Sequence, residues 1–96
     1  MDIIEEIGME AALGKLAEEA AELAQAALKL QRILHGTNPT PVTLEEAKAA
    51  LIEESVDVDI CLAVIGEADQ SIRFDADLQA AKKERWMRRI EEARHE

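Results

Sequence analysis

The sequence predicts an all-α protein, an antiparallel helical bundle completed by homo-oligomerisation, in a single domain of residues 1–96. Alanine, leucine and glutamate dominate the chain, and its two prolines, Pro39 and Pro41, stand in one short segment. Apolar residues are 48% of the chain, but many are alanine, and only one Trp and one Phe are present. The core of one copy would therefore be thin, so we expect packing against a second copy.

Four helices are expected along the chain. A loop over residues 35–41 combines Gly36 with the two prolines and separates two long helices. Thr43 and Glu46 form a capping box that starts the third helix, and residues 69–74 connect it to the fourth. The expected helices cover residues 2–8, 9–34, 43–66 and 75–94.

Composition and charge exclude several classes of function. The net charge of −10 argues against a nucleic-acid-binding surface. The longest strongly apolar run, Ile60 to Ile65, is far too short to cross a bilayer, so no membrane partner is expected. The acidic first residues do not resemble a signal peptide, and the single Cys61 fits a reducing compartment, so a cytoplasmic location is expected. The chain also lacks the GxxxxGK[ST] loop of P-loop enzymes.

A repeated acidic pattern is the most informative feature of the chain. The segment from Leu16 to Leu23 recurs 35 residues later, from Leu51 to Val58. Each copy belongs to an apolar helical seam that is interrupted once, by a glutamate. The two seams are Ala12, Leu16, Glu19, Leu23, Ala26, Leu30 and Ala47, Leu51, Glu54, Val58, Cys61, Ile65. Since buried, clustered carboxylates repel one another, a chain that places them in two facing seams is expected to bind a cation there.

The acids of the two seams supply only oxygen ligands. An acid three residues after each seam glutamate shares its face at the edge, so the predicted metal ligands are Glu19, Glu22, Glu54 and Asp57. This ligand set favours Mg²⁺, with Mn²⁺ possible, over zinc or copper. Glu18 and Glu53 lie about 100° away from their neighbours on each helix. Either could orient a metal-bound water or act as a general base in catalysis, and the spacing does not decide between them.

Two other interpretations of the acids compete with a metal site. The acids could be solvated side chains on surface helices, although two copies in the same seam register argue against this. A di-iron carboxylate bundle needs Glu-x-x-His pairs, whereas His35 and His95 lie in a loop and at the terminus. Cys61, on the same face as Asp57, is expected to be a small core residue rather than a ligand.

The last predicted helix carries a basic cluster. Six of the eleven Lys and Arg residues fall between Lys82 and Arg94. Beside a metal centre, such cations form a site for a polyphosphate, so the predicted substrate-binding residues are Lys82, Lys83, Arg85 and Trp86. The alternatives are that the cations complement the helix dipole and pair with nearby glutamates, and that Trp86 is a core anchor.

The motifs resemble those of a known family. Glu18-Glu19-x-x-Glu22 followed by Glu54-x-x-Asp57 is similar to the EExxE…ExxD signature of the MazG-like all-α nucleoside triphosphate pyrophosphohydrolases, in particular the small phage and prophage members. The segment from Lys82 to Trp86 resembles the K-x-x-R segment of that family. The resemblance covers roughly Gly8 to Ile90.

The resemblance implies an activity and a set of roles. The reaction would be Mg²⁺-dependent hydrolysis of a nucleoside triphosphate between the α- and β-phosphates, giving a monophosphate and pyrophosphate. The working unit would be a homodimer or a dimer of dimers. Lys82 and Arg85 would contact phosphate, the four acids named above would bind the metal, and Glu18 and Glu53 would support them. The alternatives are a phosphoribosyl-ATP pyrophosphohydrolase and a non-catalytic helical interaction protein.

Overall fold

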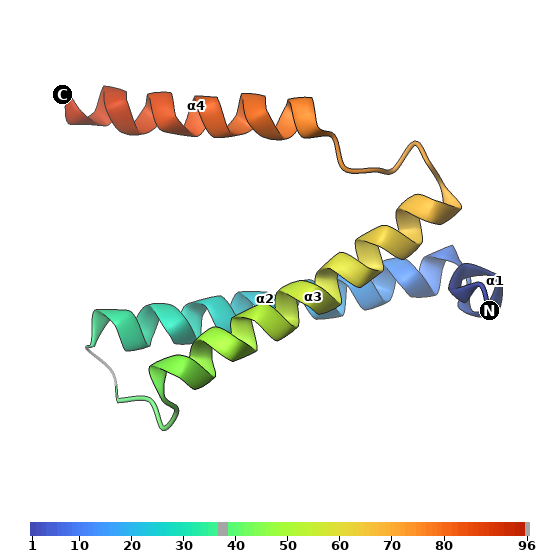
Figure 1. Cartoon of the computed structure of the whole chain (residues 1–96), viewed down its shortest axis with the longest axis horizontal. Coiled ribbons are helices and arrows are strands. Elements are labelled where there is room, and N and C mark those ends of the chain that lie inside the picture. The colour runs from blue at the N-terminus through green and yellow to red at the C-terminus, as the bar shows by residue number, and fades with distance from the viewer. Residues whose placement is uncertain (37–38, 96) are drawn as a thin grey trace.

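The computed structural model describes residues 1–36 and 39–95, and it confirms that these parts of the chain are all-helical. Of the predicted loop, Thr37 and Asn38 lie outside the described residues. The helices are α1 (Ile3–Ile7), α2 (Met9–His35), α3 (Leu44–Ala68) and α4 (Ala76–Arg94) (Figure 1).

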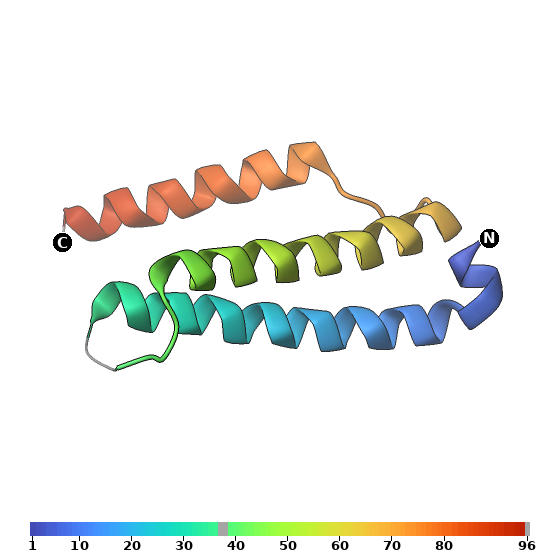
Figure 2. The ribbon, with the colours of Figure 1, turned by 60° about the horizontal axis from the view of Figure 1, so that its bottom comes forward.

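Helices α2 and α3 form an antiparallel hairpin, and α1 contacts both of them at one end (Figures 1 and 2). Each residue of the two predicted seams is buried or half-buried, which confirms the face assignment made from the spacing. Ala12 and Ala47 are 4% and 2% exposed, and Ile65 is 1% exposed. Because the most buried seam positions are mostly small, the two backbones can lie close enough for short acidic side chains to meet between them.

Local sequence signals explain where the helices begin and end. The Thr43 hydroxyl accepts from the Glu46 N–H, and the Glu46 carboxylate accepts from the Thr43 N–H, both at 3.1 Å, so the capping box is confirmed. Helix α2 ends at His35, one residue later than expected, and Gly36 follows it with a φ of 75°. Asp75 caps α4 by accepting from the N–H of Leu78 at 3.0 Å.

Helix α4 stands apart from the other three helices. It makes no contact with α1, α2 or α3 in the described part of the chain, and all of its residues are exposed. Figures 1 and 2 show it held away from the hairpin. The alternative that Trp86 is a core anchor is therefore not met within one chain, where Trp86 is 68% exposed. The connection after α3 leads the helix away, so no other helix of the described ranges covers Trp86.

The connection between α3 and α4 has a defined geometry. The Ser71 backbone N–H and hydroxyl both donate to Asp69 Oδ1, at 3.0 and 2.6 Å, and these bonds lower the pKa of Asp69. At Gly66, in the last turns of α3, a Cβ would lie only 3.1 Å from the backbone oxygen of Ile72. A glycine at position 66 therefore lets the connection pass close against α3.

None of the helices in the described ranges combines the length and apolarity that a membrane-crossing segment requires.

Candidate metal and phosphate site

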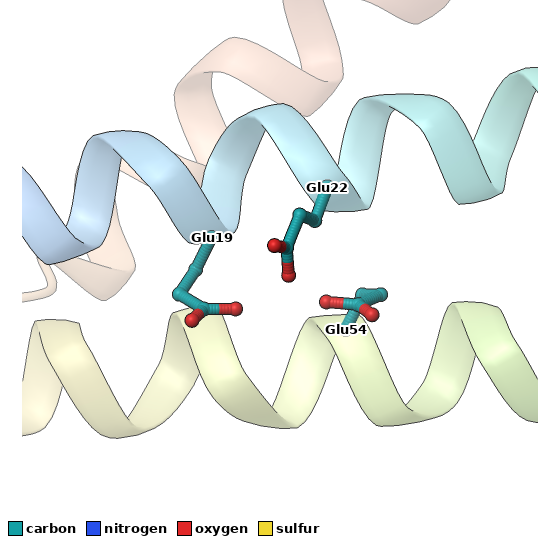
Figure 3. A group of neighbouring side chains, drawn as sticks. All are labelled: Glu19, Glu22 and Glu54. Atoms are coloured by element: carbon teal, nitrogen blue, oxygen red, sulfur yellow. The ribbon is translucent and has the colours of Figure 1, made fainter.

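Three carboxylates converge at the middle of the hairpin. Glu19 and Glu22 come from α2 and Glu54 from α3, and their carboxylates face one another across the seam (Figure 3). One carboxylate oxygen from each residue can be chosen so that all three lie within 4.8 Å of one another. The structure thus brings together three of the four predicted metal ligands.

Two of these carboxylates have an oxygen without a partner. The Glu19 side chain is only 13% exposed. Glu19 Oε2 and Glu54 Oε2 are both buried, and neither has a hydrogen-bond partner among the described residues. A buried acceptor left unsatisfied is costly, and a divalent cation with oxygen ligands would satisfy both atoms. The carboxylate donor set fits Mg²⁺ or Mn²⁺.

The electrostatics of the cluster agree with this arrangement. The pKa of Glu22 is raised above its ordinary value, first by the negative charge of Glu19 and then by the charge of Glu54. The negative charges of Glu19 and Glu54 therefore oppose the ionisation of Glu22. A cation bound between the three carboxylates would instead favour the ionised form of Glu22 and lower its pKa.

Lys15 is a neighbour that the sequence analysis missed. Its Nζ lies 3.2 Å from Glu19 Oε1, one helical turn away on α2. The hydrogen bond and charge of Glu19 raise the pKa of Lys15, and the negative charge of Asp57 adds to this. The i, i+4 spacing of Lys15 and Glu19 was the available signal. Lys15 thus offsets part of the negative charge of the site.

The other predicted acids lie outside the group of three. Asp57 is half-buried one turn beyond Glu54, and its charge makes a minor contribution to the raised pKa of Lys15. Glu18 and Glu53 are exposed on α2 and α3. The roles of Asp57 as a ligand and of the two exposed glutamates in catalysis stay predictions.

An open hollow of about 570 Å³ adjoins the carboxylates. Glu22 and Glu54 line it at one end, and Gln25, Lys29 and Arg32 contribute from the following turns of α2. These α2 residues follow one another at gaps of three and four, which places them on one helix face. Neither Lys29 nor Arg32 forms an ion pair with any residue of the described ranges. The sequence analysis did not single out these two cations, because it followed only the apolar seam and the cluster in the last helix.

The cations predicted from the last helix are not beside the carboxylates in one chain. Four residues predicted to bind substrate are exposed on α4, namely Lys82, Lys83, Arg85 and Trp86, and within the described ranges α4 has no contact with α2 or α3. Their role in substrate binding stays a prediction, and within a dimer it would depend on α4 of the other copy.

Comparisons of this chain with models of protein families, with curated proteins and with solved structures found no match. The resemblance to the MazG-like enzymes rests on the motif residues themselves.

Proposed function

We propose that this protein is a Mg²⁺-dependent nucleotide pyrophosphohydrolase, which cleaves a nucleoside triphosphate between the α- and β-phosphates to a monophosphate and pyrophosphate. The observation that carries the proposal is the meeting of Glu19, Glu22 and Glu54 between two helices, with two buried oxygens that find no partner in the described part of the chain. The family resemblance supplies the reaction, and we propose that the enzyme works as a homo-oligomer.

In this proposal Glu19, Glu22 and Glu54 hold the cation, with Asp57 as a fourth ligand. The bound cation would supply the positive charge that draws a polyphosphate toward carboxylates and stabilises charge on the attacked phosphate. Glu18 or Glu53 would accept a proton from the attacking water at a carboxylate oxygen.

The hollow beside the carboxylates supports a polyphosphate as the substrate. A site with acids alone would bind a metal, but this one continues into a surface with two cations that form no ion pair with the described residues. Lys29 lies seven residues after Glu22, or about 10 Å along the helix axis, and long side chains can shorten that separation. We propose that Lys29 and Arg32 bind phosphate oxygens that the cation leaves uncompensated. Lys82, Lys83 and Arg85 are the alternative ligands for these phosphates, and they could serve them only from α4 of another copy.

The test is pyrophosphate release from a panel of canonical and modified nucleoside triphosphates, with Mg²⁺, with Mn²⁺ and with EDTA. Metal-dependent formation of equal amounts of monophosphate and pyrophosphate is expected, and Glu19→Gln and Glu54→Gln should abolish it. A Lys29→Gln/Arg32→Gln variant compared with Lys82→Gln/Arg85→Gln would show which pair of cations binds the substrate.

Two alternatives are separated by the same experiment. Turnover of phosphoribosyl-ATP alone would indicate the phosphoribosyl-ATP pyrophosphohydrolase. The exposed α4 favours the second alternative, a non-catalytic helical interaction protein. That alternative predicts no turnover and a melting temperature that Mg²⁺ leaves unchanged.

A further inference from the structure

The single chain exposes far more surface than a compact protein of its size. Its accessible surface is 7870 Å², whereas a compact monomer of 10.6 kDa exposes about 5,500 Å². Its radius of gyration is 17.4 Å, against about 12.5 Å for a compact domain of this length. The surplus is about 2,400 Å² per chain on that scaling. The helix α4, with all its residues exposed, accounts for the extended shape (Figure 2).

Helix α4 presents an apolar patch formed by Trp86, Met87 and Ile90. Their exposed fractions are 68%, 60% and 45%, and spacings of three and four place them on one face. Around this patch α4 carries six Lys and Arg residues against four acids, a net charge of +2. This is the basic element of an otherwise strongly acidic chain.

The outer face of α3 is complementary to that patch. Ile52, Val56 and Ile60 are 64%, 50% and 51% exposed, and they follow one another at gaps of four on the side of α3 opposite the seam. Glu53 and Asp59 lie beside them on the exposed side of the helix. With seven acids and one lysine, α3 has a net charge of −6.

We propose that α4 of one copy packs across the outer face of α3 in a second copy, and that the two copies exchange these helices reciprocally. The Trp86 patch would cover the stripe of Ile52, Val56 and Ile60, with cations of α4 beside acids of α3. A second copy is the partner that these observations identify, because one chain carries both complementary surfaces and a two-fold axis pairs each with the other. If each chain buries its surplus, the interface totals about 4,800 Å², within the range of obligate homodimers.

The inference does not depend on the proposed enzymatic activity, because it rests on apolar area, charge and the isolation of α4. A dimer without pyrophosphohydrolase activity would leave it intact. Conversely, an active monomer would overturn it and leave the function standing.

The proposed interface can be tested by crosslinking the outer face of α3 in one copy to the apolar patch of α4 in another. Two single-thiol variants, Val56→Cys and Met87→Cys, are made in a Cys61→Ala background, mixed, and treated with a thiol crosslinker that has a flexible spacer. The expected product is a crosslinked pair containing one chain of each variant. Ala24→Cys, on an exposed part of α2, replaces Val56→Cys in the control mixture and should give little of that product. Equal yields in the two mixtures would overturn the proposed docking face.

Light scattering and fluorescence supply readouts without substitutions. The parent protein should have the mass of a dimer at micromolar concentration. Trp86 is the only tryptophan and the chain has no tyrosine, so the emission reports on α4 alone. It should be blue-shifted in the dimer and shift to the red on dilution to monomers. A monomeric mass with blue-shifted emission would mean that α4 folds onto its own hairpin, and a monomeric mass with red-shifted emission would mean that it stays undocked. Either result overturns the exchange.

Discussion

Replacing Glu54 with glutamine should stabilise the protein without metal and weaken its response to metal. Glu54 and Glu19 place carboxylate oxygens up to 4.8 Å apart. Two unit charges at that distance repel by about 0.9 kcal/mol in water and about 3.5 kcal/mol at an effective dielectric constant near 20. Glu54→Gln removes this repulsion, and its amide can donate to the unpartnered oxygen of Glu19. We expect the free energy of unfolding in EDTA to rise by about 1 to 3 kcal/mol.

The response to Mg²⁺ should change in the opposite direction. A ligand at one hundred times its Kd stabilises the parent protein by about 2.7 kcal/mol, which for a chain of this size is a rise of roughly 10 °C or more in Tm. The Glu54→Gln protein loses a ligand and should gain much less. Its melting curve should therefore lie above that of the parent in EDTA and show a smaller shift when Mg²⁺ is added.

Thermal unfolding at fixed protein concentration and ionic strength measures both effects, and a fixed concentration removes any contribution from dimer dissociation. Glu18→Gln is the matched control, because it makes the same charge change at an exposed position of α2 beside Glu19 and should alter stability by less than about 0.5 kcal/mol. If Glu54→Gln is less stable than the parent in EDTA and gains as much from Mg²⁺, the carboxylates neither repel one another nor bind the cation together.

Three further outcomes are expected. Without metal, the raised pKa of Glu22 makes a stabilising contribution that is complete below its ordinary value of 4.5 and lost as the pH rises through the raised value. The difference in Tm between Glu22→Gln and the parent should therefore shrink as a pH series falls from neutral toward 4.5, and a constant difference would contradict the coupling. Lys29→Gln/Arg32→Gln should raise KM for the nucleotide about tenfold through lost charge-assisted hydrogen bonds, with a smaller change in kcat. Lys48→Gln, outside the hollow, should leave KM unchanged. Steady-state kinetics measures KM and kcat for both variants. Thr43→Ala removes a capping hydrogen bond that the structure contains and should lower the free energy of unfolding by about 0.5 to 2 kcal/mol in urea titrations.

The hairpin and the centre of its acidic site could be predicted from the sequence because they depend on periodicity. A residue on a long helix has a direction fixed by its position relative to the apolar seam, so Glu19 and Glu54 had to lie between the helices once these packed antiparallel. The capping box placed the start of α3 in the same local way. The apolar seam and the capping box can both be recognised from residues that lie within one or two helical turns of each other in the sequence.

The position of α4 and the second pair of cations could not be predicted in this way. Trp86, Met87 and Ile90 have helical spacing, but spacing alone does not identify the surface that covers them, and among the described residues of one chain no other helix does so. Lys29 and Arg32 became visible as site residues only when α3 was in place, because α2 and α3 together form the hollow. A polar face next to the seam was the only available signal.

Gly66 gives the direction of α4 a specific chemical origin. A single methyl group at this position would meet the backbone oxygen of Ile72 at 3.1 Å, so the connection would have to yield by a few tenths of an ångström. A small shift so close to the start of α4 changes the line along which this helix leaves the hairpin. In an assembly that exchanges this helix, the angle of departure decides whether two chains close on one another or each passes its helix to the next. A substitution at residue 66, twenty residues before Trp86, could therefore convert a closed pair into an open polymer while leaving every contacting side chain unchanged.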